Sequence, residues 1–406
     1  MPKRRVLHLT HRCDGKFFFP SLVFLYSLVA CSDAPQWTGL VEMRDGIEVI
    51  SNPGDPLLAE AQEFVTDLWA IQGSTWEDPS LVHAGSGFIT VVDPKANRVH
   101  VVTTSGETRE SLGQSGGGPG EFVRLLDAFP VDDRLVVLDG GRVSIDFLDF
   151  DGNYLSSLHL GSSAFGGVPL GDGEYLLSGQ FGVREDPFVL DAKGRTGGWV
   201  RVSEGQEPIP FAPALESLPE EQGVQCSRFS SWPGGAARLR LTTPQIQLFD
   251  RGGRLLREIR ISLPVEPTSD AERDFALSEM RSDLATSGVP PEFAQQQLIV
   301  MEERYLVKCR FGSLEFDPSG RLAAFLEQNP DEFGSGNATL HFLSQDGVYL
   351  AKVVFPTAWR DFTLDNGVVY ALTRSPTTDL ITLRAYRVDL PNSLFTDAAE
   401  VLEEAR

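Results

Sequence analysis

A strand-and-turn pattern that recurs along the chain most constrains what this sequence can fold into. Six short apolar segments, of which 88–93 (FITVVD) and 134–139 (RLVVLD) are clear examples, each follow a tight turn. The six turns lie at Gly87, Asp133, Gly173, Gly235, Gly320 and Gly367. Short strands separated at such intervals by Gly and Asp are typical of an all-β repeat fold.

A second turn completes most of the repeating units. It lies at Gly106, Asp151-Gly152, Lys193-Gly194, Gly252-Gly253 and Asp346-Gly347, where glycine supplies the positive φ of a tight hairpin. Because only five second turns accompany six first turns, the sixth unit, which ends with 380–388, lacks its outermost strand. We expect residues 39–51 to supply that strand and to close a ring of sheets with few exposed edges.

Two of the intervals between first turns are long, which indicates insertions within 204–232 and 266–305. The second insertion is predicted to be helical, because Ser269 and Glu272 form a capping box and Leu277 begins an apolar face. Residues 392–406 are expected to form a C-terminal tail or a short helix.

The Gly-rich segment 113–122 (GQSGGGPGEF) resembles the GPGEF segment of the six-bladed β-propeller lipoproteins, an NHL-like group of bacterial propellers. Residues 91–102 look like the strand, turn and strand of that family, and residues 364–390 look like its terminal blade. The resemblance implies a six-bladed β-propeller over residues 39–391, with the last blade closed by an N-terminal strand. It implies no catalytic set.

The first thirty residues have the features of an export signal. Five basic residues precede an apolar run from Phe17 to Ala30, and this order is typical of a secretory signal. The run is too short to span about 30 Å of hydrocarbon. Residues 28–31 (LVAC) resemble the lipobox of bacterial lipoproteins, which implies cleavage before Cys31 and lipidation of its thiol. A plain anchor helix, or a cleaved signal with an unrelated cysteine, is the alternative.

We therefore expect residues 1–30 to be a lipoprotein signal peptide and residues 31–38 to be a tether. The protein is expected in the cell envelope, as a periplasmic or outer-membrane lipoprotein that meets the membrane through its lipid anchor only. An oxidising periplasm permits a disulfide between Cys226 and Cys309. Two separate buried thiols explain this pair of cysteines equally well.

The charge of the chain excludes one class of partner. It carries 35 Lys and Arg against 57 Asp and Glu, for a formal net charge of −22. A field of this sign repels the phosphates of nucleic acids, so no nucleic-acid partner is expected.

No motif in the sequence establishes catalysis. Residues 113–117 match G-x-S-x-G, but the Gly-Pro-Gly that follows prevents the helix that a nucleophile elbow requires. No cofactor is predicted. Sugar-acid lactonases on similar propellers use an acidic metal site in the central channel, so a calcium-dependent lactonase-like hydrolase is the alternative function. Glu315 and Asp317, on or next to a strand that lines the channel, are its candidate metal ligands.

Strand order selects one face of the ring as the predicted binding surface. In a four-stranded up-and-down sheet, the turns between second and third strands and the links between sheets share one face, here called the link face. Both Gly turns share the other, here called the turn face. Loops gathered on a rigid scaffold commonly carry function.

We expect Asp93 with Arg98, and Asp139 with Arg142, to brace link-face turns, and Glu121 to accept backbone N–H bonds. The candidate binding residues are Asp93, Arg98, Glu121, Phe122, Asp139, Arg142, Trp232, Phe293 and Phe333.

The function predicted from the sequence is that of a binding or scaffolding module for a protein, peptide or carbohydrate partner in the cell envelope. An assembly factor for outer-membrane proteins is a further candidate.

Overall fold

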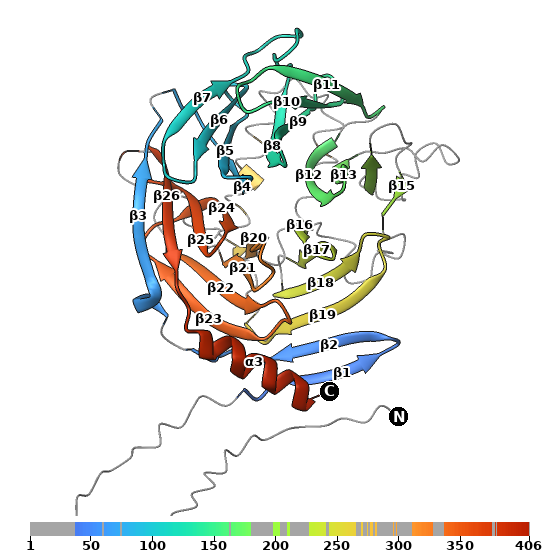
Figure 1. Ribbon diagram of the computed structural model, residues 1–406, viewed down its shortest axis with the longest axis vertical. Helices are drawn as coiled ribbons and strands as arrows, with labels where there is room; N and C mark the ends of the chain where they lie inside the picture. Colours follow the sequence, from blue (N-terminus) through green and yellow to red (C-terminus); the bar gives the residue numbers. More distant parts are fainter. Residues whose placement is uncertain are drawn as a thin grey trace, which may run out of the picture.

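Six β-sheets surround a central axis in the computed structural model (Figure 1). The structure describes residues 37–58, 61–73, 75–161, 164–179, 198–203, 209–211, 227–240, 243–264, 269–270, 311–327, 337–375, 378 and 380–405, together with six residues between 274 and 298. The predicted all-β six-bladed propeller is confirmed.

Blades 1 to 3 follow one another along the chain, and each runs from an inner strand at the axis to an outer strand. Blade 1 consists of β4 (Leu81–Gly85), β5 (Phe88–Asp93), β6 (Arg98–Thr103) and β7 (Thr108–Leu112). Blade 2 consists of β8 (Leu125–Val131), β9 (Arg134–Asp139), β10 (Ser144–Leu148) and β11 (Tyr154–His159). Blade 3 consists of β12 (Ala164–Gly171), β13 (Glu174–Gly179), β14 (Gly198–Ser203) and β15 (Ile209–Pro210).

Blades 4 to 6 complete the ring. Blade 4 contains β16 (Ser227–Trp232), β17 (Gly235–Arg240), β18 (Gln245–Asp250) and β19 (Leu255–Ile261). Blade 5 contains β20 (Phe311–Phe316), β21 (Leu322–Glu327), β22 (Ala338–Ser344) and β23 (Tyr349–Phe355). Blade 6 contains β24 (Trp359–Asp365), β25 (Val368–Arg374), β26 (Ile381–Val388) and β3 (Val65–Ile71). The inner strands contact one another in the closed order β4, β8, β12, β16, β20, β24 and back to β4.

An N-terminal strand closes blade 6, as expected, but it is not formed by residues 39–51. β3 pairs antiparallel with β26, so that Val65 lies opposite Val388. Residues 39–51 instead contribute to a hairpin of β1 (Leu40–Arg44) and β2 (Ile47–Asn52), and β2 adds in parallel to the outer strand β19 of blade 4. The prediction was wrong because Asp45 and Gly46 both adopt positive φ, 51° and 83°. That turn folds the segment back on itself.

A hydrogen-bond hub fixes this hairpin to the ring. The side chain of Asn52, which is 2% exposed, donates to the carbonyls of Arg260 and Gly347 at 3.2 and 2.9 Å. Its Oδ1 accepts from the indole of Trp37 at 3.0 Å and from the backbone N–H of Tyr349 at 2.9 Å. Trp37 is thereby held on the outer perimeter of the ring, next to blades 4 and 5.

Among the described residues, the helical segments lie outside the six blades, and a short 3-10 helix, η1 (Gln62–Phe64), leads into β3. Within the predicted insertion 266–305, the described residues Asp270, Asp274, Leu277, Ser278, Arg281, Gln295 and Leu298 are all helical. At the C-terminus, α3 (Asn392–Ala405) buries Leu394, Ala398 and Leu402 against blades 5 and 6. The spacing of four residues places these side chains on one helix face. None of the described helices is long and apolar enough to cross a membrane.

Candidate functional site

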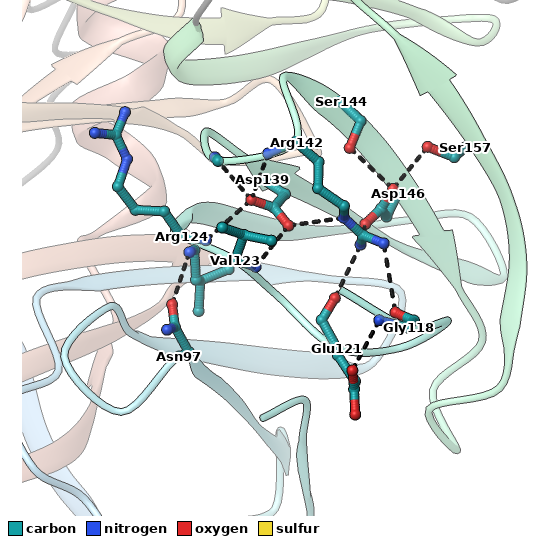
Figure 2. A network of polar contacts seen from close by, with 12 residues as sticks. Asn97, Gly118, Glu121, Val123, Arg124, Asp139, Arg142, Ser144, Asp146 and Ser157 are labelled. Carbon is teal, nitrogen blue, oxygen red and sulfur yellow. Dashed lines mark hydrogen bonds and ion pairs between the residues drawn. The ribbon is translucent and has the colours of Figure 1, made fainter. Parts of the chain in front are cut away.

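The predicted link face is held together by buried aspartates. At the end of β9, Asp139 accepts N–H bonds from Val123 and Arg124 in the incoming link, at 2.9 and 3.0 Å, and from Gly141 and Arg142 in the next turn, at 2.9 and 3.2 Å (Figure 2). Burial alone would raise the pKa of this carboxyl, but the N–H donors outweigh burial and lower it.

Arg142 connects Asp139 to the GPGEF segment. Its Nε donates to Asp139 at 2.9 Å, and its guanidinium also donates to the carbonyl of Glu121 at 2.9 Å and pairs with Asp146 (Figure 2). The Glu121 carboxylate accepts the N–H of Gly118 at 2.7 Å, and this bond is the main reason that its pKa is lowered. The predicted Asp139–Arg142 brace and the predicted N–H bond to Glu121 are both present.

Asp93 repeats this arrangement in blade 1. Its carboxylate accepts N–H bonds from Glu77, Asp78 and Ala96 at 2.6 to 3.2 Å. Arg98 lies opposite it in the strand register, and Nε2 of His100 is 3.8 Å from Oδ2 of Asp93. Asp93 therefore braces its turn through the backbone.

Several predicted binding residues do not lie on an accessible link face. Asp93, Phe122 and Asp139 are 0%, 0% and 1% exposed, so their side chains lie beneath the surface of the link face, and contact with a partner stays a prediction. Phe122 packs in the core between blades 1 and 2. Arg98, Glu121 and Arg142 remain half-buried on that face.

Trp232 lies on the opposite face from the one predicted. It is the last residue of the inner strand β16 and is followed by the Pro233-Gly234 turn, which belongs to the turn face. Phe293 and Phe333 lie outside the described residues, as do Cys31, Cys226 and Cys309.

A cavity of about 620 Å³ occupies the central channel. It is lined by all six inner strands, and its lining continues past their middle to the turn-face residues Gly171, Pro233 and Pro318. The cavity therefore extends toward the turn face, which is the face that carries Trp232.

Large apolar side chains form part of the cavity wall near the turn face. They include Phe129, Leu170, Trp232 and Phe316. The indole of Trp232 donates to the carbonyl of Phe249 at 2.9 Å, and its ring centroid lies 6.5 Å from that of Phe316. This hydrogen bond and the ring contact fix the orientation of the indole.

Polar side chains lie deeper in the channel because of bulges in the inner strands. The register of β8, β12 and β24 shifts just before Asp127, Gly166 and Asp361, the third residue of each strand, and a bulge commonly redirects a side chain. Asp361 accepts the N–H of Val82 in blade 1 at 3.1 Å and the hydroxyl of Ser313. These contacts join blades 5, 6 and 1 at the axis.

His83 lies among these carboxylates. Its Nε2 is 2.8 Å from Oδ1 of Asp127, which also accepts the N–H of Ala128 at 2.9 Å. Burial disfavours the imidazolium, but the charge and hydrogen bond of Asp127, together with the charges of Asp361 and Glu315, outweigh burial and raise the pKa of His83 to about 9. His83 is therefore protonated at neutral pH.

The candidate metal ligands Glu315 and Asp317 both line the cavity. Oε2 of Glu315 is 3.5 Å from the hydroxyl of Thr363. Asp317 accepts the N–H groups of Ser319 and Gly367 at 2.9 and 3.0 Å and so fastens two turns. Among the described residues, no group of three or more His, Cys, Asp or Glu side chains is arranged to hold a metal ion.

The sequence contains one signal for the channel residues. Asp127 and Asp361 are each the third residue of an inner strand, LLDAFPV and WRDFTLD. A carboxylate at the same position of two repeats indicates a shared structural position.

Comparison with known proteins supports the fold without naming a family. No family model and no curated protein matches the chain. A candidate exported protein of Bacteroides fragilis matches with a TM-score of 0.51 and 12% identity, over 84% of this chain and 100% of that one. A DUF4221 family member from Bacteroides vulgatus matches with a TM-score of 0.51 and 9% identity, over 81% of this chain and 98% of that one. The chain is thus similar in structure alone to bacterial propellers that include a candidate exported protein.

Proposed function

We propose that this propeller is an exported, lipid-anchored binding module of the cell envelope whose ligand enters the channel cavity from the turn face. The cavity carries this proposal. Its volume of about 620 Å³ is in the range of small-molecule and side-chain sites, and it combines apolar walls with a few convergent polar groups, as such sites do.

Binding is better supported than catalysis by the chemistry of the channel. The carboxylates of Asp127 and Asp361 accept backbone N–H bonds from Ala128 and Val82, which commits them to holding the inner strands. Nε2 of His83 is paired with Oδ1 of Asp127 at 2.8 Å, which orients the ring toward that carboxylate. These groups provide charge and shape, which suffice for recognition.

The localisation in this proposal, the cell envelope, rests on the N-terminal sequence. The basic and apolar segments before Cys31 have the order of an export signal, and a structurally similar propeller is a candidate exported protein. Lipidation of Cys31 would add more than one acyl chain, which anchors a protein stably.

The test is to occlude the cavity and compare what the tagged, full-length protein captures from its own cells. A side chain at Gly166 would enter the cavity, and its Cβ would meet nothing closer than 3.7 Å. Gly166→Leu should therefore fold and lose the envelope component that the wild type captures. The matched control is Gly117→Leu on the link face, where a Cβ meets nothing within 4 Å. Undiminished capture by Gly166→Leu would overturn the proposal.

A further inference from the structure

A second cavity adjoins the channel cavity on the turn face. Its volume is about 320 Å³ and it lies between blades 4 and 5, where Leu248 and Arg257 contribute to its walls. It shares Trp232, Pro233 and Phe316 with the channel cavity. The two cavities are therefore parts of one surface that passes over this aromatic pair from the channel toward the outer strands.

Acidic side chains are in excess along this surface. In the channel cavity, Asp127, Glu315, Asp317 and Asp361 stand against two basic residues, His83 and Arg251. In the second cavity, Glu48 and Asp346 stand against Arg257 alone, which pairs with both of them at 2.5 and 3.6 Å. Low-dielectric walls focus such a field, so the surface favours a cationic group.

The surface between the acidic regions is apolar and continuous. Trp232, Pro233 and Phe316 separate the two cavities, and Leu248 and Leu256 continue the apolar lining into the second one. A ligand that occupies both cavities would place apolar groups over Trp232 and Phe316 and a positive charge in the channel. A neutral sugar matches the channel poorly, because it needs paired donors and acceptors, whereas Asp127 and Asp361 already accept bonds from the backbone.

We propose that the occupant is an extended polypeptide segment, with a Lys or Arg side chain in the channel and an apolar side chain on Trp232. This inference rests on the proposed function and specifies its ligand. Affinity comes from the apolar contact over the aromatic pair, and the charge of the channel sets the preference for a basic residue.

The experiment selects from a library of short random peptides on the purified full-length protein and then measures the affinity of an enriched, labelled peptide by fluorescence anisotropy. The enriched peptides should carry a basic residue next to an apolar one. Glu315→Gln and Trp232→Ala should each weaken binding by about tenfold or more. The control Glu110→Gln removes a carboxylate from β7, the exposed outer strand of blade 1, and should change affinity by less than about twofold.

Urea unfolding of each variant identifies a folding defect. If Trp232→Ala unfolds, Glu315→Gln and Gly166→Leu decide the outcome. Enriched peptides without a basic residue, or equal affinity in Glu315→Gln, would overturn the inference. A failure to enrich any peptide, while Gly166→Leu still loses the natural partner, would overturn the polypeptide ligand and leave the proposed function standing. A Gly166→Leu variant that keeps the partner would remove the proposed function itself.

Discussion

Aspartate is the residue that joins the parts of this propeller. Asp93 and Asp139 end the second strands of blades 1 and 2, where each accepts N–H groups from a link and from a turn. Asp127 and Asp361 lie on inner strands, and Asp361 accepts the N–H of Val82 in the next blade. An ionised carboxylate accepts several such bonds at once, and each is stronger than a bond between neutral groups.

Asp139→Asn should lower the free energy of unfolding by about 2–4 kcal/mol, because buried N–H donors lose a charged acceptor. The pKa of Asp139 is lowered in the folded protein. The contribution of its carboxylate to stability is therefore present above about pH 4, and it is lost as the pH falls through the lower pKa of the folded state. Urea unfolding measures the change. Asp151→Asn, at an exposed turn residue, is the control. Equal stabilities of the two variants would contradict the role given to Asp139.

His83 should make stability depend on pH in the alkaline range. Its pKa is raised from 6.5 to about 9, so its pairing stabilises the fold fully below pH 6.5, and this contribution is lost as the pH rises through 9. The loss is at most about 3 kcal/mol. Thermal unfolding between these pH values should show a steeper decline for the wild type than for His83→Gln. Parallel curves would show that His83 does not titrate in this way.

At the scale of strands and blades, the outermost strand of blade 6 shows what the sequence could predict. The repeat of turns predicted six sheets and a missing strand, because each turn is encoded locally by Gly, Asp or Asn. The residues that form the closing strand could not be predicted from such local signals. β3 (VTDLWAI) is largely exposed and lacks a clear apolar pattern, and its position follows from pairing with β26, more than three hundred residues away.

Trp69 is the residue of β3 on which closure should depend most. Its ring is half-buried, lies 5.8 Å from that of Tyr370 and packs against the core between blades 1 and 6. Trp69→Ala should lower the free energy of unfolding by about 2–4 kcal/mol, since it removes much of the apolar contact of the strand. Its neighbour Leu68 is 40% exposed, so Leu68→Ala should cost less than about 1 kcal/mol. Urea unfolding compares the two, and a larger effect at Leu68 would contradict this assignment.

At the scale of the whole molecule, the candidate site exists because six blades close into a ring around a channel. The sequence pattern does not show that channel, so it predicted the loops of the link face as the binding surface. Strand order correctly predicted which turns and links share a face. It could not predict the depth of the channel, which depends on small residues such as Gly166, Ser230 and Ser313 from three blades. Contacts such as that of Val82 with Asp361 bring together positions 279 residues apart.

The proposed lipid anchor concerns the whole molecule and has a direct test. Cells grown with labelled palmitate should label the wild type and should not label Cys31→Ser, which should leave the membrane fraction. Cys226→Ser should remain labelled and membrane-bound, because its thiol is not at the proposed processing site. Label in Cys31→Ser would contradict the lipoprotein assignment.

The docking of Trp37 on Asn52 has a consequence for how the ring would stand at a bilayer. Position 31, the proposed lipid attachment point, precedes Trp37 by six residues, and a stretch of that length reaches about 20 Å at full extension. Trp37 is fixed to the perimeter beside blades 4 and 5, so a lipid at Cys31 would keep this part of the circumference close to the headgroups. A ring held to the membrane at this point of its circumference would leave both of its openings accessible to molecules that diffuse along the surface.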